Sequence, residues 1–484
     1  MRRSSTGAGP HTSWNARLVG LIVVLALVNF VVDSAITAPL LVLPEMLDHF
    51  DTDQPAWLNA TAMLAGVMWA PLLGKAADIH GTRKVLVLTL LLGGAGSLIC
   101  AVAPHIALFV AGRMLQGASL AAVFLAVAIV RDACAPRIAM IAVGIVTSSS
   151  AVLNIASRFL IERLATAFGF HVLFFVSAFV AAAMAITVRT TIAESRTRTP
   201  GKLDLGGAVL LGGGLAGVLG YISLGSSLGW LAAPPLALLA VGVVALVWWF
   251  VGASRKPEPL IDVRNIGGPL KLTLLVIFLG AGAYQSMLQL IPLVGAVPAE
   301  RGLGYGLAGQ GSVALLLAVP AIGLVVGGPV AGWLAARIGP AATLAGGVVL
   351  GFVVSLGMLL GVAQLPVALC SAFLLGVTAG AIATSGFNTA AALAPTERQG
   401  VVSSLVVVGV SIGSVALDFV GSAVLSSTVV VVDGETMNSA TGVFSYIAIA
   451  SAAFAIAAVV AGGLVRRTRA NRTPSAPGLE RNPA

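Results

Sequence analysis

The sequence predicts an all-α polytopic membrane protein, and three observations lead to that fold class. The 484 residues are 58% hydrophobic and only 9% charged, whereas a soluble domain carries about 25% charged residues. The apolar runs are long and repeated, so the chain is expected to cross the bilayer many times. The 57 glycines suit close helix packing in lipid, and no segments of alternating polarity indicate a β-barrel.

Fourteen apolar runs are long enough to cross a bilayer, each with roughly 18 residues or more. The predicted spans are residues 18–40, 58–77, 85–104, 106–130, 138–161, 170–188, 205–228, 231–253, 270–292, 308–331, 341–361, 366–390, 400–426 and 441–465. The sequence therefore predicts 14 transmembrane helices.

The basic residues predict the orientation of these helices. With the N-terminus in the cytoplasm, all but four of the 27 Lys and Arg residues fall in inner loops and tails. Arg163 and Arg301 fall in outer loops, and Arg113 and Arg158 fall inside helices. Basic residues favour the cytoplasmic side, so both termini are expected there. The net charge of +9 then reflects membrane topology rather than nucleic-acid binding.

A short motif occurs twice at the predicted inner side. Residues 74–84 read GKAADIHGTRK, and residues 332–340 read GWLAARIGP, so Gly74 aligns with Gly332 and Gly81 with Gly339. Each copy joins a descending helix to an ascending one. Secondary transporters are often built from two repeated halves with the substrate site between them.

The first copy resembles the loop signature of the major facilitator superfamily, G-x-x-x-D-R/K-x-G-R/K-R/K. Gly74, Asp78, Gly81, Arg83 and Lys84 fit it, while Ile79 and Thr82 depart from it. LFVAGRMLQGAS, which contains Arg113, Gln116 and Gly117, resembles the second signature of that superfamily. VVDSAITAPLLVLP, with Asp33, resembles an element of the fourteen-helix drug:proton antiporter branch.

This resemblance implies a major-facilitator-type helix bundle with two six-helix halves plus two additional helices. It divides the chain into an N-terminal half (1–190), a cytoplasmic linker with the two extra helices (191–269), a C-terminal half (270–465) and a disordered cytoplasmic tail (466–484). It also implies proton-coupled export of a small drug or antibiotic.

Asp33, Arg113 and Gln116 are the predicted proton-coupling or substrate residues of the first half. Lipid burial favours a neutral carboxylate, so Asp33 is suited to take up a proton outside and release it inside. Arg113 needs a partner, and Asp33 matches its depth. Alternatively, Asp33 is held by the hydroxyls of Ser34 and Thr37, or Asp33 and Arg113 form a purely structural ion pair.

Asp418 is the only charge in the predicted membrane core of the second half. It is a candidate to contact a cationic substrate or to be a second protonation site. The alternative is a carboxylate solvated near the outer interface.

The loop residues Gly74, Asp78, Gly81, Arg83 and Lys84 are predicted to form a conformational latch. Asp78 is expected to face the N-terminus of a neighbouring helix or a basic side chain and so hold the inner side closed. The second copy has Ala336 at the matching position, so only one half can latch this way. The alternative is a plain positive-inside loop.

Helix five departs from the antiporter pattern. The family's Gly- and Pro-rich signature is expected at residues 153–162, which read LNIASRFLIE. Arg158 and Glu162 are four residues apart and share one face. They are read either as a pair that reaches the outer interface or as a charge pair at the mouth of the substrate path.

The sequence contains no enzyme signature, metal-ligand spacing or nucleotide-binding loop, so no cofactor is predicted and an ion gradient is the expected energy source. The expected partners are a small-molecule substrate, protons and membrane lipid, and the chain is expected to be a monomer in the bacterial inner membrane. The alternatives are a facilitator or symporter of a metabolite, or a non-transporting membrane sensor.

Overall fold

The computed structural model is almost entirely helical. It describes residues 12–37, 39, 42–51, 55–195, 198–256, 259–261, 264, 266–296, 304–305, 310–394, 398–432 and 435–470. Within these residues, 14 helices are long and apolar enough to cross a membrane. The predicted all-α polytopic fold class is therefore confirmed.

The first half contains six of these spans and one shorter helix, α2. Its helices are α1 (Ala16–Thr37), α2 (Leu43–Phe50), α3 (Pro55–His80), α4 (Thr82–Ala101), α5 (Ile106–Gln116), the 3-10 helix η2 (Gly117–Leu120), α6 (Ala121–Ala133), α7 (Pro136–Phe168) and α8 (His171–Thr191). Helices α5, η2 and α6 together make one span.

Two more spans follow, and then the six spans of the second half. The two are α9 (Leu205–Leu228) and α10 (Ala233–Arg255). The second half contains α11 (Gly268–Ala296), α12 (Gln310–Ile338), α13 (Pro340–Gly361), α14 (Leu365–Leu393), α15 (Gln399–Ser427) and α16 (Ala440–Ala470), with the antiparallel strands β1 (Val429–Val432) and β2 (Glu435–Asn438) between α15 and α16.

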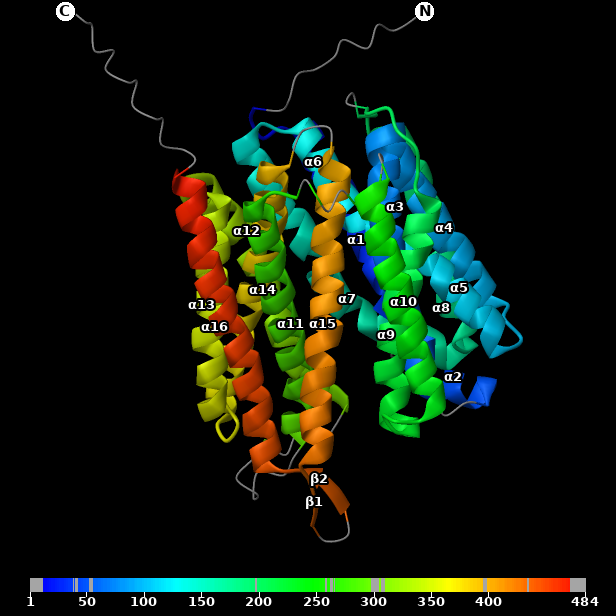
Figure 1. Cartoon of the computed structure of the whole chain (residues 1–484), viewed down its shortest axis with the longest axis vertical. Coiled ribbons are helices and arrows are strands. Elements are labelled where there is room, and N and C mark those ends of the chain that lie inside the picture. Colours follow the sequence, from blue (N-terminus) through cyan, green and yellow to red (C-terminus); the bar gives the residue numbers. More distant parts are fainter. Residues whose placement is uncertain are drawn as a thin grey trace, which may run out of the picture.

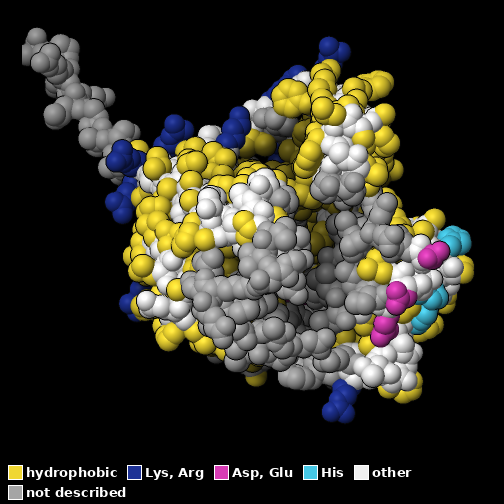
Figure 2. All heavy atoms as spheres, turned by 90° about the horizontal axis from the view of Figure 1, so that it is seen from below, with side chains coloured by type: hydrophobic (Ala, Val, Ile, Leu, Met, Phe, Trp, Pro, Cys, Tyr) yellow, Lys and Arg dark blue, Asp and Glu magenta, His cyan; other side chains and the backbone are white. Residues whose placement is uncertain are grey.

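The two ends of the bundle differ in composition. We call the end where α1 begins and α16 finishes the basic end, because Arg17, Lys84, Arg137 and Arg467 lie there, and the opposite end the hairpin end (Figure 1). Viewed from the hairpin end, hydrophobic side chains cover much of the flank, and acidic and histidine side chains gather at one edge (Figure 2). An apolar flank between polar ends suits a membrane-spanning bundle.

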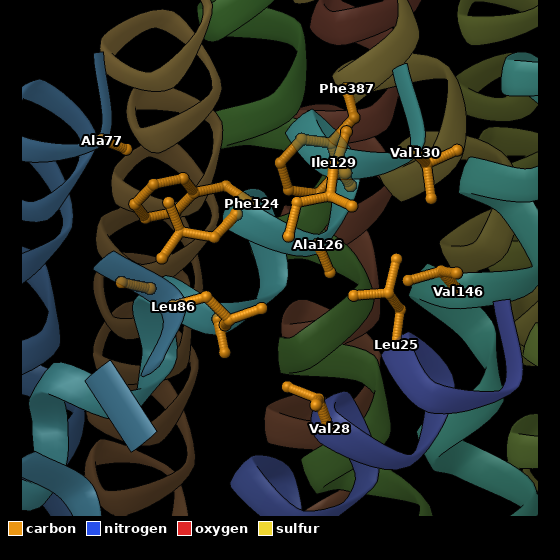
Figure 3. Packing of buried hydrophobic residues seen from close by; sticks show 14 of the residues in the cluster. Leu25, Val28, Ala77, Leu86, Phe124, Ala126, Ile129, Val130, Val146 and Phe387 are labelled. Carbon is orange, nitrogen blue, oxygen red and sulfur yellow. The ribbon is translucent and has the colours of Figure 1, made fainter. Parts of the chain in front are cut away.

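Two large hydrophobic cores organise the bundle. One core lies within the second half and contains buried residues of α11 to α16. The other is built mainly from the first half, but it also takes in Ile277, Phe387 and Val406 from α11, α14 and α15. Figure 3 shows Phe387 near Phe124 and Ile129 of α6. The N-terminal and C-terminal halves of the chain therefore share a core, which lies toward the basic end of the bundle.

The two extra helices pack on the outside of the first half. Helix α9 lies against α3, where a Cβ at Gly212 would come within 2.3 Å of Met68 Cβ. Helix α10 packs on α9, and Val241, Val244 and Trp248 are 59–69% exposed on it. Exposed apolar residues on a spanning helix fit contact with lipid.

The predicted span 106–130 is broken by η2. The hydroxyl of Ser119 donates to the carbonyl of Gln116 (2.6 Å) and so competes with the regular helical bond. A Cβ at Gly117 would come within 2.4 Å of the carbonyl oxygen of Ala62 on α3. The tight turn thus brings the backbone of this span against α3.

Two short elements at the hairpin end were not predicted. Helix α2 buries Met46 and leaves Glu45, Asp48 and His49 exposed. The strands β1 and β2 flank Asp433-Gly434 in the sequence, a dipeptide that favours tight hairpin turns. Both elements are too short for a search based on membrane-length apolar runs.

Candidate functional site

Arg113 and Gln116 are fully buried inside the first half, with 0% of each residue exposed. They lie one turn apart on α5, so both point from the same face of that helix. An arginine stays charged in proteins, and a charge in this position needs polar partners.

The end of α1 supplies those partners. Arg113 Nη2 donates to the carbonyl of Ile36 (3.2 Å), and Arg113 Nη1 donates to Gln116 Oε1. Gln116 Nε2 donates to the carbonyl of Ala35 (3.2 Å) and to Ser97 Oγ (2.9 Å). The last carbonyls of a helix lack partners within the helix, and a cation at this end is favoured by the helix dipole. Arg113 and Gln116 therefore cap the C-terminus of α1.

Asp33 lies on the same last turn of α1 and is half-buried. Its backbone carbonyl accepts a hydrogen bond from the Thr37 hydroxyl (2.9 Å). The Arg113 guanidinium binds carbonyls two and three residues farther along α1. The structure thus gathers Asp33, Arg113 and Gln116 around one helix end.

Asp78 meets the N-terminus of α15 in the other half of the chain. Its two carboxylate oxygens accept hydrogen bonds from the backbone N–H groups of Gly400 (2.8 Å) and Val401 (3.1 Å). These are among the first N–H groups of the helix, which lack intrahelical partners. A carboxylate there also gains from the helix dipole, so Asp78 ties α3 to α15.

Gly74 allows this approach. A Cβ at Gly74 would come within 2.8 Å of the Gly400 carbonyl oxygen, and a Cβ at Gly400 within 2.5 Å of the Gly74 carbonyl oxygen. Any larger side chain at either position would push α3 away from α15 and lengthen the Asp78 hydrogen bonds.

The remaining loop residues contact the connector that follows α8. Gly81 has φ +102°, in the left-handed region, and its missing Cβ leaves room for Glu194. Arg83 Nε lies 3.5 Å from Glu194 Oε2, and its backbone N–H donates to Glu194 Oε1 (3.0 Å). Lys84 is exposed. The loop therefore holds the connector against the first half.

Asp418 lies on α15, away from the first-half cluster. It is partly buried, and its Oδ1 atom has no hydrogen-bond partner among the residues that the structure describes. Gly421, one turn farther along, faces the ring of Tyr446 on α16, because a Cβ there would come within 2.2 Å of that ring. Asp418 thus offers an acceptor inside the second half.

Arg158 and Glu162 lie in the later part of α7, and their side chains fall outside the described residues. Their predicted pairing stays a prediction. Of the described residues, no group of three or more His, Cys, Asp or Glu side chains could hold a metal ion.

Sequence reasoning missed a polar contact between the halves at the basic end. Asn388 of α14 is 0% exposed, and it accepts from Arg131 Nη1 (3.4 Å) and donates to the carbonyl of Met140 (3.3 Å). The signal was available, because an Asn in an otherwise apolar, small-residue span needs hydrogen-bond partners.

Comparison with known proteins identifies the family to which this chain belongs. The family model described as Major Facilitator Superfamily matches residues 24–207 and 205–417. A proton:xylose symporter of that superfamily superposes with a TM-score of 0.65 over 93% of this chain and 96% of its own, at 15% sequence identity. At that identity the superposition supports the fold alone.

Two curated relatives carry names that point to different functions. A uridine/deoxyuridine transporter of Lactococcus lactis is 29% identical over 68% of this chain and 69% of its own length. A multidrug resistance protein B homolog of Mycobacterium tuberculosis is 30% identical over 43% of this chain, which spans 39% of that relative. One name is that of a nucleoside transporter and the other that of a drug-resistance protein.

Proposed function

Because the chain belongs to the major facilitator superfamily, we propose that it exports a small amphipathic drug or antibiotic across the bacterial inner membrane in exchange for protons. The chain is a multi-pass membrane transporter and not an enzyme. In this proposal the basic end faces the cytoplasm, so that the excess of Lys and Arg follows the positive-inside preference.

The observation that carries the proposal is the cluster of half-buried Asp33 with buried Arg113 and Gln116 around the end of α1. The guanidinium already has acceptors at the end of α1, so Arg113 stays solvated by protein when Asp33 gains or loses its proton. A carboxylate on the same helix turn can then gain or lose a proton while the arginine keeps these acceptors. That arrangement supports proton coupling.

The cycle we propose alternates between closure at the two ends of the bundle. The hydrogen bonds from Gly400 and Val401 to Asp78 hold the basic end closed. In this state Asp33 takes up a proton from the outer side. Protonation removes its attraction to Arg113 and favours the opposite state, in which the proton leaves to the cytoplasm and substrate enters.

Asp418 is proposed to contact the substrate from the second half. Its unsatisfied carboxylate oxygen would be stabilised by a cationic group, so we favour substrates that carry a basic nitrogen. A neutral polar cargo would leave Asp418 to act as a second protonation site.

A facilitator or symporter is the second candidate function. Residues 153–162 contain none of the glycines and prolines of the antiporter signature, and the uridine/deoxyuridine transporter is a relative by name. Inward movement of a labelled nucleoside, driven by a proton gradient, would favour this candidate over export.

The test is growth of a host that lacks its own efflux pumps on a panel of toxic cationic and neutral compounds. We expect the chain to raise resistance to some cationic compounds and Asp33→Asn to remove that resistance at equal expression. Glu45→Gln, which neutralises an exposed carboxylate on α2, is the matched control and should keep it. Resistance that survives in Asp33→Asn would contradict the proposed coupling site.

A further inference from the structure

The two copies of the loop motif make the same close helix crossing with different chemistry. In the first copy Gly74 crosses α15, and Asp78 binds the end of that helix. In the second copy a Cβ at Gly332 would come within 2.4 Å of the Met140 carbonyl oxygen on α7. Ala336 stands where the carboxylate would be and cannot bind the N-terminus of α7.

A buried amide occupies the neighbourhood of that second crossing. Asn388 of α14 donates from Nδ2 to the same Met140 carbonyl (3.3 Å) and accepts at Oδ1 from Arg131 of α6 (3.4 Å). A side-chain amide offers both donors and an acceptor, and here both ends are used. One residue thus links α6, α7 and α14 across the two halves.

The same face of α14 makes a second contact one turn farther from the basic end. Thr384 Oγ1 lies 3.3 Å from Thr147 Oγ1 on α7. Thr384 and Asn388 are four residues apart on α14, and Met140 and Thr147 are seven apart on α7, so both pairs lie along one seam. This seam runs along the boundary between the halves.

We propose that Arg131 and Asn388 form a second inner lock, which holds the α7–α14 side of the basic end closed where Ala336 leaves the repeat without its carboxylate. Asn388 is a positioning residue: it fixes α14 against α7 and does not bind substrate. When the basic end opens, water can replace each of these hydrogen bonds, so the lock releases without leaving a buried charge unpaired.

Pairing an amide with an arginine suits a contact that must form and break each time the basic end closes and opens. A buried carboxylate opposite Arg131 would form an ion pair that is costly to separate in a poorly solvated region. A neutral amide binds the guanidinium more weakly and also donates to the Met140 carbonyl. The lock therefore stabilises the closed state without trapping it, whatever the substrate or direction of transport.

The experiment measures closure directly, through a disulfide across the seam. The parent carries Thr147→Cys and Thr384→Cys, with Cys100, Cys134 and Cys370 replaced by serine, and a protease site in the exposed loop at residues 229–231. After cleavage, the two fragments migrate together only if the disulfide has formed. The initial rate of disulfide formation then reports the closed fraction of the purified full chain.

We expect Asn388→Leu and Arg131→Leu each to lower the closed-to-open ratio about fivefold, the change in an equilibrium that follows loss of a typical net hydrogen bond, and so to slow disulfide formation relative to the parent. Thr378→Val is the matched control, because Thr378 is a buried hydroxyl on α14 that faces Gly351 of α13 within the second half. Its rate should equal that of the parent.

The second arm tests the equivalence of the two copies. Ala336→Asp restores the missing carboxylate, and in the Asn388→Leu background it should return the rate to near the parental value. If Asn388→Leu does not yield monodisperse protein, Arg131→Leu, at the edge of the bundle, carries the same test. A parental rate in folded variants, an equal loss in Thr378→Val, or no recovery with Ala336→Asp would each overturn the proposal.

Discussion

The first half of the molecule makes its two key contacts with charged side chains, Arg113 and Asp78, whereas the second half makes the corresponding contact with a neutral amide, Asn388. In the first half Arg113 binds the end of α1 and Asp78 binds the start of α15. In the second half the matching loop has Ala336, and Asn388 makes the contact across the seam. Repeated architecture therefore does not imply repeated chemistry.

This difference indicates a division of labour between the halves. Charged groups in lipid are costly, and here they are placed where backbone dipoles at helix ends can stabilise them. Among the described membrane spans of the second half, one contains a carboxylate, Asp418, and one oxygen of that carboxylate has no described partner. On this account the first half couples transport to protons, and the second half mainly supplies shape and a contact for cargo.

The largest effect is expected from Arg113→Leu. Its loss would leave the carbonyl of Ile36 and the side chain of Gln116 without their donor, at a cost of about 1–3 kcal/mol for each buried group. We expect transport to fall to background and the melting temperature in detergent to drop by several degrees. Arg113→Lys should restore part of the stability and little transport, because lysine cannot reproduce the planar fork. Near-normal transport by Arg113→Leu would contradict the role of the cluster.

A smaller effect is expected from Asp78→Ala, which removes a latch and not a substrate contact. Loss of a carboxylate that caps a helix costs about 1 kcal/mol, so the basic end should open more often. Substrate binding should persist while the transport rate falls several-fold, as measured side by side on one preparation. Lost binding with a normal transport rate would show that Asp78 has another role.

A still smaller effect on stability is expected when low pH protonates Asp204 at the start of α9. Partial burial of Asp204 favours its neutral form, but hydrogen bonds from Lys256 Nζ (2.7 Å) and the Gly207 N–H (2.9 Å) outweigh it and hold the pKa of Asp204 below its ordinary value. Its contribution to stability is therefore present above the ordinary Asp pKa of about 3.9 and is lost as pH falls through the lowered pKa. The melting temperature should drop slightly more in the parent than in Asp204→Asn between about pH 5 and pH 3. Equal drops would contradict this assignment.

The smallest effect is expected at helix five. If Arg158 and Glu162 lie near the outer interface, water and lipid headgroups solvate either charge, and Arg158→Leu or Glu162→Leu should each cost about 0–1 kcal/mol. The double variant should then be no better than either single one in thermal stability or transport. A severe loss in Arg158→Leu that Glu162→Leu rescues would instead make them a buried pair in the transport path.

The sequence was sufficient to predict the membrane-spanning helices, because the length of an apolar run depends on bilayer thickness and not on tertiary contacts. The structure begins α9 at Leu205 and ends it at Leu228, as predicted. The break at η2 could not be predicted, since it depends on the close approach of Gly117 to α3. Helix α2 and the β1–β2 hairpin are also set by local turns rather than by membrane length.

The candidate site was predictable by residue type and less so by partner. Asp33, Arg113 and Asp78 stand out because charges are rare in membrane spans. The pairing of Asp33 with Arg113, suggested by their depth along the helices, stays a prediction. The structure adds hydrogen bonds from Arg113 to a backbone carbonyl of α1 and to Gln116, which no side-chain pattern reveals. Likewise, only the three-dimensional structure shows that the helix end facing Asp78 belongs to α15.

The central claim is that the buried cluster of the first half couples transport to protons. The most direct measurement places the purified chain in proteoliposomes with an imposed pH gradient and follows a cationic compound to which it confers resistance. We predict accumulation against the compound's gradient in the parent and in Glu45→Gln, and only downhill movement in Asp33→Asn. Uphill transport by Asp33→Asn at the parental rate, or accumulation by the parent that is unaffected when the pH gradient is collapsed, would contradict the account.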